Sequence, residues 1–412
     1  MATGTSASAA GRAGGSGTDD GGTALRIAHL QHPYVPGLGY QENYLPAAQQ
    51  ALGAQVLTLT SDVVPPKFED VVTEFSPGVY EYNGVETRRL EALFSVETIE
   101  DVALSGVADA LDDFEPDVVH AHGLVSPRTL QAMRYARDTD VALFVDVHVD
   151  NDNFSLDSPF ERAAFVAFRR LVLPRLLDRT AAFLPVNPLS AAFLDDLGVP
   201  DDQRRLLPLG VDPSTFAPDP DQRAATRGRL DAEDAFLLVT AGNLEPSKDV
   251  GTLIDALARV LSAHPDTRLL VVGGGEDAYI EDLRDRARAA GVAHAVTFTG
   301  AVERPELAAL YNAADVGVWP GKLGMAIVEA VGTGLPVVVC DSPATAFLTK
   351  RDNGLSFPRG DADALADRLI DYGDHPKRRA RAAVAGAAYA REELAWSEIA
   401  ATSLQIYRED VA

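Results

Sequence analysis

The chain has 412 residues, more than one ordinary hydrophobic core contains, and this length suits two domains. Its 61 acidic and 36 basic residues give a formal net charge of −25, which excludes general attraction to nucleic acid or anionic lipid unless basic residues cluster locally. No apolar run reaches the roughly 18 residues that cross a bilayer, and the single cysteine, Cys340, excludes an internal disulfide. We therefore expect a soluble protein of a reducing cytoplasm.

From residue 25 onward, short β-branched and aliphatic runs alternate with longer amphipathic stretches, the pattern of parallel strands joined by helices. The near-continuous hydrophobicity of several runs is typical of strands buried on both faces. The predicted fold class is therefore α/β, with two doubly wound parallel sheets. The predicted strands are 25–30, 54–60, 117–122, 142–148 and 181–186 in the first half, and 235–242, 267–274, 295–300, 315–320 and 335–340 in the second.

The two halves of this pattern predict two Rossmann-like domains, at 25–190 and 211–384, joined by a linker at 191–210. The first 24 residues (1–24) are small, polar and rich in glycine, which predicts a disordered tail without the apolar core of a signal peptide. An Ala-rich helix at 385–412 is expected to return to the first domain.

The loop after the first predicted strand contains Gly37 and Gly39, and Tyr40 follows at the start of a helix. Glycine permits tight turns and close backbone approach, and the free N–H groups at a helix start attract anions. This loop is a candidate for phosphate or acceptor contact, with a plain strand-to-helix turn as the alternative. Its glycine spacing differs from the dinucleotide fingerprint, which argues against NAD or FAD.

Six segments in order carry a wider resemblance. They are PGLGYQE (36–42), DVVHAHG (117–123), PLGVDPSTFAPD (208–219), AGNLEPSKDVGTLIDAL (241–257), LLVVGGGED (269–277) and VWPGKLGMAIVEAVGTGLPVVV (318–339). Together they resemble the retaining glycosyltransferases of family 4, whose architecture is called GT-B. The resemblance implies two facing Rossmann-like domains with a cleft between them, a nucleotide-diphosphate sugar as donor, a glycan or polyprenyl-linked acceptor, and no metal or other cofactor.

On the donor side, the resemblance assigns the diphosphate to Lys248, whose positive charge would stabilise a leaving phosphate. The family has an arginine five residues earlier, where this chain has Asn243, which donates hydrogen bonds but brings no charge. Gly274 and Val302 are also assigned to donor binding, with the base and ribose near the loop at 299–302. A solvated surface lysine is the alternative for Lys248.

Glu329 corresponds to the family glutamate that accepts the donor ribose hydroxyls. Eight residues earlier the family has a second glutamate, whereas this chain has Gly321 followed by Lys322. Either Lys322 and backbone groups replace that carboxylate, or activity is weak or lost. The N–H groups expected to face the phosphates open the helix of Glu329 and belong to Gly324, Met325 and Ala326.

His122 ends the DVVHAH run, and the resemblance assigns it to the reacting sugar, where an imidazole can donate a hydrogen bond or take a proton. His120, two residues earlier, is expected to be structural. Further along, His148 and Asp150 are candidates for the acceptor side of the cleft.

The acids that alternate around His148 are Asp146, Asp150 and Asp152, and such carboxylates can ligate a hard cation. We nevertheless expect no metal, because the Asp-x-Asp metal motif belongs to the other major glycosyltransferase architecture.

The segment 160–179 differs from the acidic composition of the rest of the chain, since it carries more arginines than acids. Phe165, Phe168, Val172 and Leu176 fall on one helical face, although Pro174 should kink or divide the helix. One interpretation is peripheral contact with the inner face of a membrane, on anionic headgroups. The alternative is a core helix with its apolar face inward.

Two other function classes stay open. One is a GT-B-like sugar-nucleotide epimerase, which would release epimerised donor without an acceptor. The other is a non-catalytic nucleotide-sugar-binding or scaffold protein, which the losses at Asn243 and Gly321 favour. No carboxylate pair of the glycosidase kind is evident, which weighs against hydrolysis.

The acidic surface with only five lysines resembles proteins of extreme halophiles, with a haloarchaeal origin as the interpretation and an acidic protein from a GC-rich genome as the alternative. The halophile interpretation predicts that the melting temperature rises with KCl. Between ~0.1 M, where the Debye length is about 10 Å, and molar salt, where it is about 3 Å, self-repulsion should be progressively screened. Differential scanning calorimetry across this range tests it, and a flat or falling melting temperature would contradict it.

Overall fold

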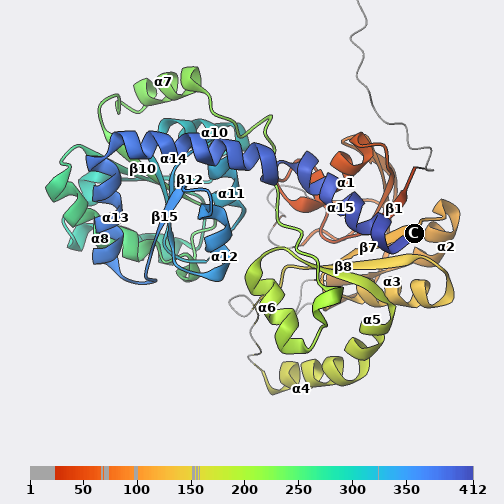
Figure 1. Ribbon diagram of the computed structural model, residues 1–412. Helices are drawn as coiled ribbons and strands as arrows, with labels where there is room; N and C mark the ends of the chain where they lie inside the picture. The colour runs from red at the N-terminus through yellow and green to blue at the C-terminus, as the bar shows by residue number, and fades with distance from the viewer. Residues whose placement is uncertain are drawn as a thin grey trace, which may run out of the picture.

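The computed structural model describes residues 24–65, 68, 74–96, 101–150, 154, 156, 158–322 and 324–411. Residues 1–23 of the expected tail at 1–24 lie outside the described residues. Asp152, one of the alternating acids, also lies outside them. The described chain forms two α/β domains, with the first half in one and most of the second half in the other (Figure 1).

The first domain is built on a seven-stranded sheet with the order β3-β4-β2-β1-β7-β8-β9, in which only β3 runs antiparallel to its neighbour. Its strands are β1 Arg26–Leu30, β2 Gln55–Ser61, β3 Gly78–Tyr82, β4 Val85–Leu90, β7 Val118–His122, β8 Ala142–Val147 and β9 Thr180–Pro185, with a separate hairpin of β5 Ala92–Val96 and β6 Asp101–Leu104. Its helices are α1 Gln41–Ala51, α2 Val107–Phe114, α3 Pro127–Asp138, α4 Pro159–Ala167, α5 Leu173–Arg179 and α6 Pro188–Leu197.

The second domain is built on a six-stranded, fully parallel sheet with the order β12-β11-β10-β13-β14-β15. Its strands are β10 Phe236–Ala241, β11 Thr267–Val272, β12 Val296–Gly300, β13 Val316–Trp319, β14 Val337–Cys340 and β15 Gly354–Phe357. The helices of this half are α7 Pro220–Arg229, α8 Val250–Ala263, α9 Asp277–Ala289, α10 Arg304–Ala313, α11 Met325–Gly332, α12 Pro343–Ala346, α13 Ala362–Asp374, α14 Pro376–Tyr389 and α15 Trp396–Val411.

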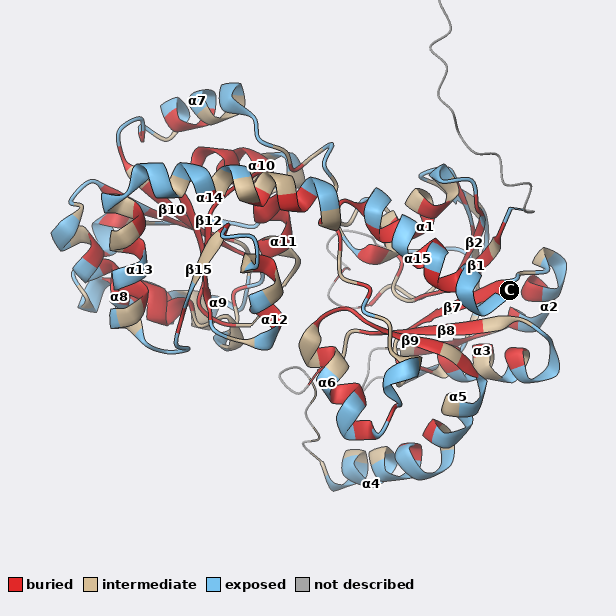
Figure 2. Cartoon of the chain, in the orientation of Figure 1, coloured by how far each residue is buried: buried red, intermediate tan, exposed pale blue. Residues whose placement is uncertain are grey.

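The predicted α/β class is confirmed, and each of the ten predicted strands is present within two residues of its expected bounds. Their apolar runs are buried because helices cover both faces of each sheet, as Figure 2 shows by the red strands in both domains. The sequence analysis missed five strands. β3, β4, β5 and β6 are short strands whose polar or exposed residues break the apolar run, and β15 has only four residues.

The expected linker at 191–210 is wrong in its extent, because most of it belongs to the first domain. α6 buries Phe193 and Leu194 in the first-domain core, and its apolar residues were hidden by the surrounding Pro, Asp and Arg. Beyond the helix, Leu207 N donates to Pro185 O at 3.0 Å, alongside strand β9. The chain enters the second domain only near Val211.

The C-terminal helix α15 lies on the first domain, as Figure 1 shows by its place beside α1, β1 and β7. Trp396 stacks on Tyr44 of α1 with the ring centroids 5.8 Å apart. Further along α15, Tyr407 packs on Phe144 of β8 at 4.6 Å. The expected boundary at 384 falls inside α14, so the segment 385–412 is the end of one helix, a single π-helical turn at 390–394, and α15.

The basic segment 160–179 is divided as expected, into α4, a π-helical turn at Phe168–Val172 and α5, which begins next to Pro174. The predicted apolar face packs against the first-domain core, which favours the core-helix alternative for that face; its residues are Phe165, Phe168, Val172 and Leu176. None of the described helices combines the length and apolar character that a bilayer crossing requires.

Candidate functional site

The carboxyl ends of strands from both sheets meet at one cavity of about 120 Å³, where ligands of parallel α/β sheets bind. From the first domain it is lined by residues that follow β8 and β9, among them His148, Asp150 and Asn187. From the second domain it is lined by residues that follow β13, β14 and β15, among them Gly321, Lys322, Gly324, Ser342 and Arg359. The structure therefore brings the expected acceptor and phosphate residues together.

Lys248 lies beside the start of α11. A Cβ on Gly324, the residue that precedes the helix, would be 3.5 Å from Lys248 Nζ, and Nζ donates to Lys322 O at 3.3 Å. The ammonium thus lies beside a helix start, and a cation next to the free N–H groups of a helix start suits an anion. Burial lowers the pKa of Lys248, and the carboxylates of Glu245 and Asp150 oppose that shift.

Gly321 has a packing role that the sequence analysis did not foresee. A Cβ at this position would overlap the backbone of Ser247 and Lys248, and the two loops are joined by Lys322 N, which donates to Ser247 O at 2.9 Å. Cys340 Sγ donates to Gly321 O at 3.1 Å from the other side. The missing glutamate is therefore accompanied by a close backbone contact that leaves no room for a side chain in this conformation.

The remaining donor candidates lie on neighbouring loops at the carboxyl ends of β10, β11 and β12. Leu244 N donates to Gly274 O at 2.7 Å, beside the exposed Asn243, whose Nδ2 donates to Glu245 Oε2 at 3.4 Å. Val302 packs against the core of the second domain. In α11, Ala326 O accepts from Tyr311, and Met325 is half-buried against the first-domain core.

Glu329 is buried in α11, with a relative exposure of 4%. Its Oε1 lies 2.5 Å from Nη1 of Arg304, at the start of α10. Burial raises the pKa of Glu329, and Arg304 opposes that rise. The sequence analysis missed Arg304, because no motif marks an arginine at a helix start 25 residues away from its partner.

On the first-domain side, a chain of buried hydrogen bonds begins in α15 and α1. Gln49 Nε2 donates to Ser403 Oγ at 2.8 Å, which leaves Gln49 Oε1 as the acceptor for His29 Nε2 at 2.7 Å. Burial lowers the pKa of His29 to about 3, so its ring is neutral and its Nδ1 accepts from His122 Nε2 at 3.0 Å. Tyr407 OH lies 2.7 Å from Nδ1 of the fully buried His120, which fits the structural role expected for that residue.

The chain ends at Asp146, which the sequence analysis considered only as one of several alternating acids. Asp146 Oδ2 is 2.6 Å from His122 Nδ1, and its Oδ1 accepts from Gly123 N at 2.9 Å. Both ring nitrogens of His122 are thus engaged, and the ring is buried rather than open to the cleft. Contact with a sugar hydroxyl would require one of these bonds to be exchanged.

His148 is the more accessible histidine, with its side chain 40% exposed at the cavity. Its Nε2 lies 3.3 Å from Asp146 Oδ2. Burial disfavours the charged ring, but the Asp146 carboxylate outweighs this and raises the pKa of His148 to about 9. Burial alone would raise the pKa of Asp146, whereas His122 and His148 hold it well below its usual range. Asp150 is buried beside them at the cavity.

The glycine loop before α1 also reaches the second domain. Gly37 has a φ of +83°, in the left-handed region that favours glycine, and Tyr40 is the half-exposed residue that precedes α1. A Cβ on Gly39 would overlap the guanidinium of Arg304. The loop therefore touches the donor side directly.

Two groups of side chains in the described part of the chain could gather around a metal ion: His29, His120 and His122, and His122, Asp146 and His148. The spacings of 2.6 Å and 3.0 Å around His122 are those of hydrogen bonds. Two ligands of a tetrahedral zinc ion lie about 3.3 Å apart, given bonds of about 2.0 Å. The contacts around His122 are thus shorter than a ligand pair, whereas His148 Nε2 and Asp146 Oδ2 are 3.3 Å apart, and the absence of a metal stays a prediction.

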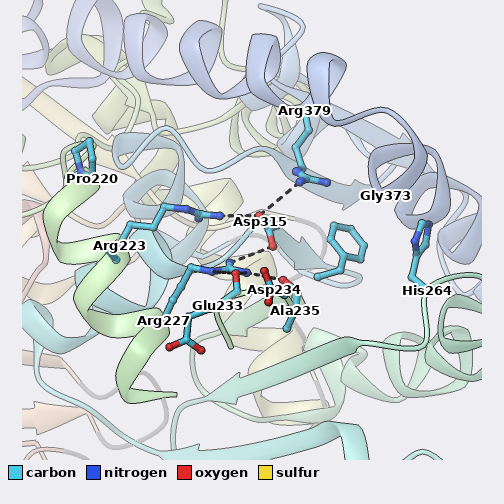
Figure 3. Close-up of a pocket in the computed structure, with 12 residues that line it drawn as sticks. Pro220, Arg223, Arg227, Glu233, Asp234, Ala235, His264, Asp315, Gly373 and Arg379 are labelled. Atoms are coloured by element: carbon cyan, nitrogen blue, oxygen red, sulfur yellow. Dashed lines mark hydrogen bonds and ion pairs between the residues drawn. The ribbon is translucent and has the colours of Figure 1, made fainter. Parts of the chain in front are cut away.

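A larger cavity, of about 670 Å³, lies at the opposite end of the second sheet (Figure 3). Asp315, directly before β13, faces Arg223 at 2.7 Å, Arg227 at 3.2 Å and Arg379 at 3.6 Å. The arginines also donate to backbone carbonyls around it, such as Arg227 Nη1 to Ala313 O at 2.8 Å. This network ties loops together and lies away from the strand ends where ligands bind.

Two family models match the chain, "Glycosyl transferase 4-like domain" over residues 37–210 and "Glycosyl transferases group 1" over residues 235–374. Sucrose-phosphate synthase from Thermosynechococcus elongatus superposes with a TM-score of 0.73 at 21% identity, covering 93% of this chain and 98% of that one. HepE from Anabaena in complex with UDP gives 0.73 at 16% identity, with 93% and 100% covered. The chain has the GT-B fold, and most of its length matches models of glycosyltransferase domains.

Curated relatives match this chain over different lengths. The GDP-mannose-dependent alpha-(1-6)-phosphatidylinositol monomannoside mannosyltransferase of Mycolicibacterium smegmatis is 36% identical over 46% of this chain and 52% of that protein. The D-inositol 3-phosphate glycosyltransferase of Streptomyces scabiei is 28% identical over 93% and 89%. The chain spans about half the length of the first curated relatives that it matches.

The raised pKa of His148 gives a pH prediction. The charged ring stabilises the fold fully below the ordinary pKa of 6.5, and this stabilisation should be lost as the pH rises through about 9. Histidine NMR with ¹³C labelling should show one ring with a midpoint near 9 that disappears in His148→Gln, and thermal stability should fall from pH 6.5 to 9 more in the parent than in this variant. His294→Gln, in a short turn before β12, is the control and should leave that midpoint in place. A parent protein in which no ring titrates above pH 8 would contradict the ion pair.

Proposed function

We propose that this chain transfers a sugar from a nucleotide-diphosphate donor to a glycan or lipid-linked acceptor with retention of configuration, as a family 4 enzyme without a metal requirement. The observation that carries the proposal is the meeting of Lys322 and Gly324 with His148 and Asp150 at one cavity. Lys248 lies directly behind this lining, because its Nζ donates to Lys322 O and is close to Gly324. A diphosphate needs cations and N–H donors, and an acceptor hydroxyl needs polar groups opposite them.

In the proposed reaction, the donor diphosphate lies beside Lys248 and the first N–H groups of α11, and the ribose hydroxyls donate to Glu329. The bond between the sugar C1 and the phosphate oxygen breaks, and a bond from C1 to the acceptor oxygen forms on the same face. The acceptor proton passes to the leaving phosphate. Lys248 would stabilise the charge that develops on this leaving group.

The acceptor would lie on the first-domain side, near His148 and the loop of Gly37, Gly39 and Tyr40. The curated relatives named for phosphatidylinositol mannosides and inositol phosphate support a polyol or lipid-linked polyol as the acceptor class and GDP-mannose as a first donor to test. His122 would act on the sugar only after giving up its contact with His29 or with Asp146, so His148 is the first-domain histidine that a substrate reaches more easily.

A non-catalytic, nucleotide-sugar-binding role is the second candidate, and one specific observation favours it. Asn243 replaces the expected arginine and no carboxylate can occupy position 321 in this conformation, so the donor site has one cation and one carboxylate fewer than the family pattern. The incubation of donor and acceptor with the protein, followed by NMR of the product's anomeric signal, separates the candidates. A product with retained anomeric configuration supports the transferase, and tight donor binding without product supports the scaffold.

The donor site is tested first by Lys248→Ala. If the ammonium acts on the leaving phosphate, its removal should cost roughly 2–4 kcal/mol of transition-state stabilisation, measured as kcat/KM. Lys377→Ala, on the exposed side of α14, is the matched control and should leave kcat/KM unchanged. Equal kcat/KM in the parent and in Lys248→Ala would show that the diphosphate binds elsewhere.

We further propose that the end of the first domain around α4 contacts membranes, which would suit a lipid-linked acceptor. α4 buries none of its residues, and Phe160 and Leu171 are 77% and 60% exposed. The same segment contains Arg162, Arg169 and Arg170, which are close to them in sequence. Exposed apolar side chains beside cations are the pattern of interfacial segments on anionic lipid.

The membrane proposal predicts that Phe160→Ser combined with Leu171→Ser weakens binding to phosphatidylglycerol vesicles by about tenfold or more, because each side chain loses about 1.5–3 kcal/mol of apolar burial. Vesicle sedimentation at the lowest KCl concentration that keeps the protein folded measures the effect. Val384→Ser, on α14 with 72% exposure, is the control that should leave binding unchanged. Equal losses in both variants, or no binding by the parent, would argue against this surface.

A further inference from the structure

Arg304 stands where the second domain meets the first. Its Nη1 is 2.5 Å from Oε1 of the buried Glu329 in its own domain. A Cβ on Gly39, in the first-domain loop before α1, would overlap the same guanidinium. One charged group therefore contacts both the carboxylate proposed for the donor ribose and a backbone of the opposite domain.

Aromatic rings from both domains surround the same group. Cζ of Arg304 lies 4.9 Å from the ring centroid of Phe216, which is buried in the second domain, and 5.7 Å from that of Tyr44 in α1. Tyr44 in turn stacks on Trp396 of α15. These contacts restrict the guanidinium to the space between Glu329 and Gly39.

Glu329 depends on this partner. Burial raises the pKa of Glu329 and so favours the neutral carboxyl, which is a poorer acceptor for two ribose hydroxyls. Arg304 is the cation that opposes this rise. Its ion pair is made to Oε1, and an ionised carboxylate has acceptor positions on both oxygens, so the pair and a ribose can be held together.

We propose that Arg304 is a positioning residue of the donor site, which orients the Glu329 carboxylate toward the donor ribose and docks the first-domain loop at Gly39 against it. The inference rests on the proposed function, because it takes Glu329 as the ribose acceptor. Donor binding and docking of the Gly39 loop are then linked, so that each favours the other.

Binding of GDP-mannose and of UDP-glucose by calorimetry, from pH 5 to pH 8, tests the donor part. Arg304→Ala should raise the dissociation constant of the tighter-binding donor about tenfold, the cost of losing a charge-assisted hydrogen bond, and the factor should grow as the pH falls because Glu329 then protonates more readily. Arg304→Lys should restore part of the affinity. Arg229→Ala is the matched control, since it breaks another arginine–glutamate pair, which joins α7 to Glu306 of α10 at 2.5 Å, and it should change the constant less than twofold.

Gly39→Ala tests the contact between the domains. In the parent background its methyl group should displace Arg304 and raise the donor dissociation constant several-fold. In the Arg304→Ala background the same change should add less than twofold, because the overlapping group is gone. Hydrogen exchange of the peptide 36–42, measured without donor, should increase in Arg304→Ala, although the substituted residue belongs to the other domain.

The outcomes separate this inference from the proposed function. If Glu329→Ala weakens donor binding but Arg304→Ala changes it less than twofold at every pH, the positioning role is overturned and the donor site stands. If neither donor binds the parent, the proposed function loses its support. Hydrogen exchange of the peptide 36–42, measured without donor, then tests by itself whether Arg304 docks the Gly39 loop. Unchanged exchange at 36–42 overturns the docking of the loop in either case.

Discussion

The arrangement of this molecule depends on two chain crossings that hydrogen-bond to each other between the domains. Val211 N donates to Leu394 O at 2.7 Å, and Trp396 N donates to Val211 O at 3.1 Å. The first crossing leads the chain into the second domain. The other crossing leads it back, so that α15 packs on the first domain. With both crossings at one place, the carboxyl ends of the two sheets are held opposite each other, where the cavity forms.

The return of α15 also shapes the chemistry of the first domain. Ser403 and Tyr407 lie under the histidines of β1 and β7 and orient them through Gln49 and His120. The last element of the chain thus supports a network that ends at Asp146, next to the cavity. Buried polar groups of this kind are stable only when each finds a partner, which ties the orientation of His122 to the docking of α15.

The donor side shows how backbone packing can replace a side chain. The loop after β13 rests on the turn of Ser247 and Lys248 so closely that Gly321 admits no Cβ. The two loops are joined by Lys322 N, which donates to Ser247 O, and by Lys248 Nζ, which donates to Lys322 O beside the start of α11. Relative to the family pattern, Asn243 removes one cation and Gly321 removes one acid, while Lys322 adds a cation next to Lys248. Two neighbouring lysines suit a diphosphate within a chain of net charge −25.

The hydrophobic periodicity and composition of the chain were sufficient to predict the α/β class and ten of the strands, because strands buried on both faces need continuous apolar runs. The family resemblance of ordered motifs singled out Lys248 and Glu329, and their roles stay predictions. The position of His148 and Asp150 after a parallel strand was sufficient to place them at the carboxyl edge of the sheet. Only the tertiary structure decided which partners these groups have. Arg304, His29 and Asp146 are distant in sequence from what they contact, and the partner of His120 lies on a helix that begins at residue 396. Such contacts follow from packing between elements, for which a local pattern carries no signal.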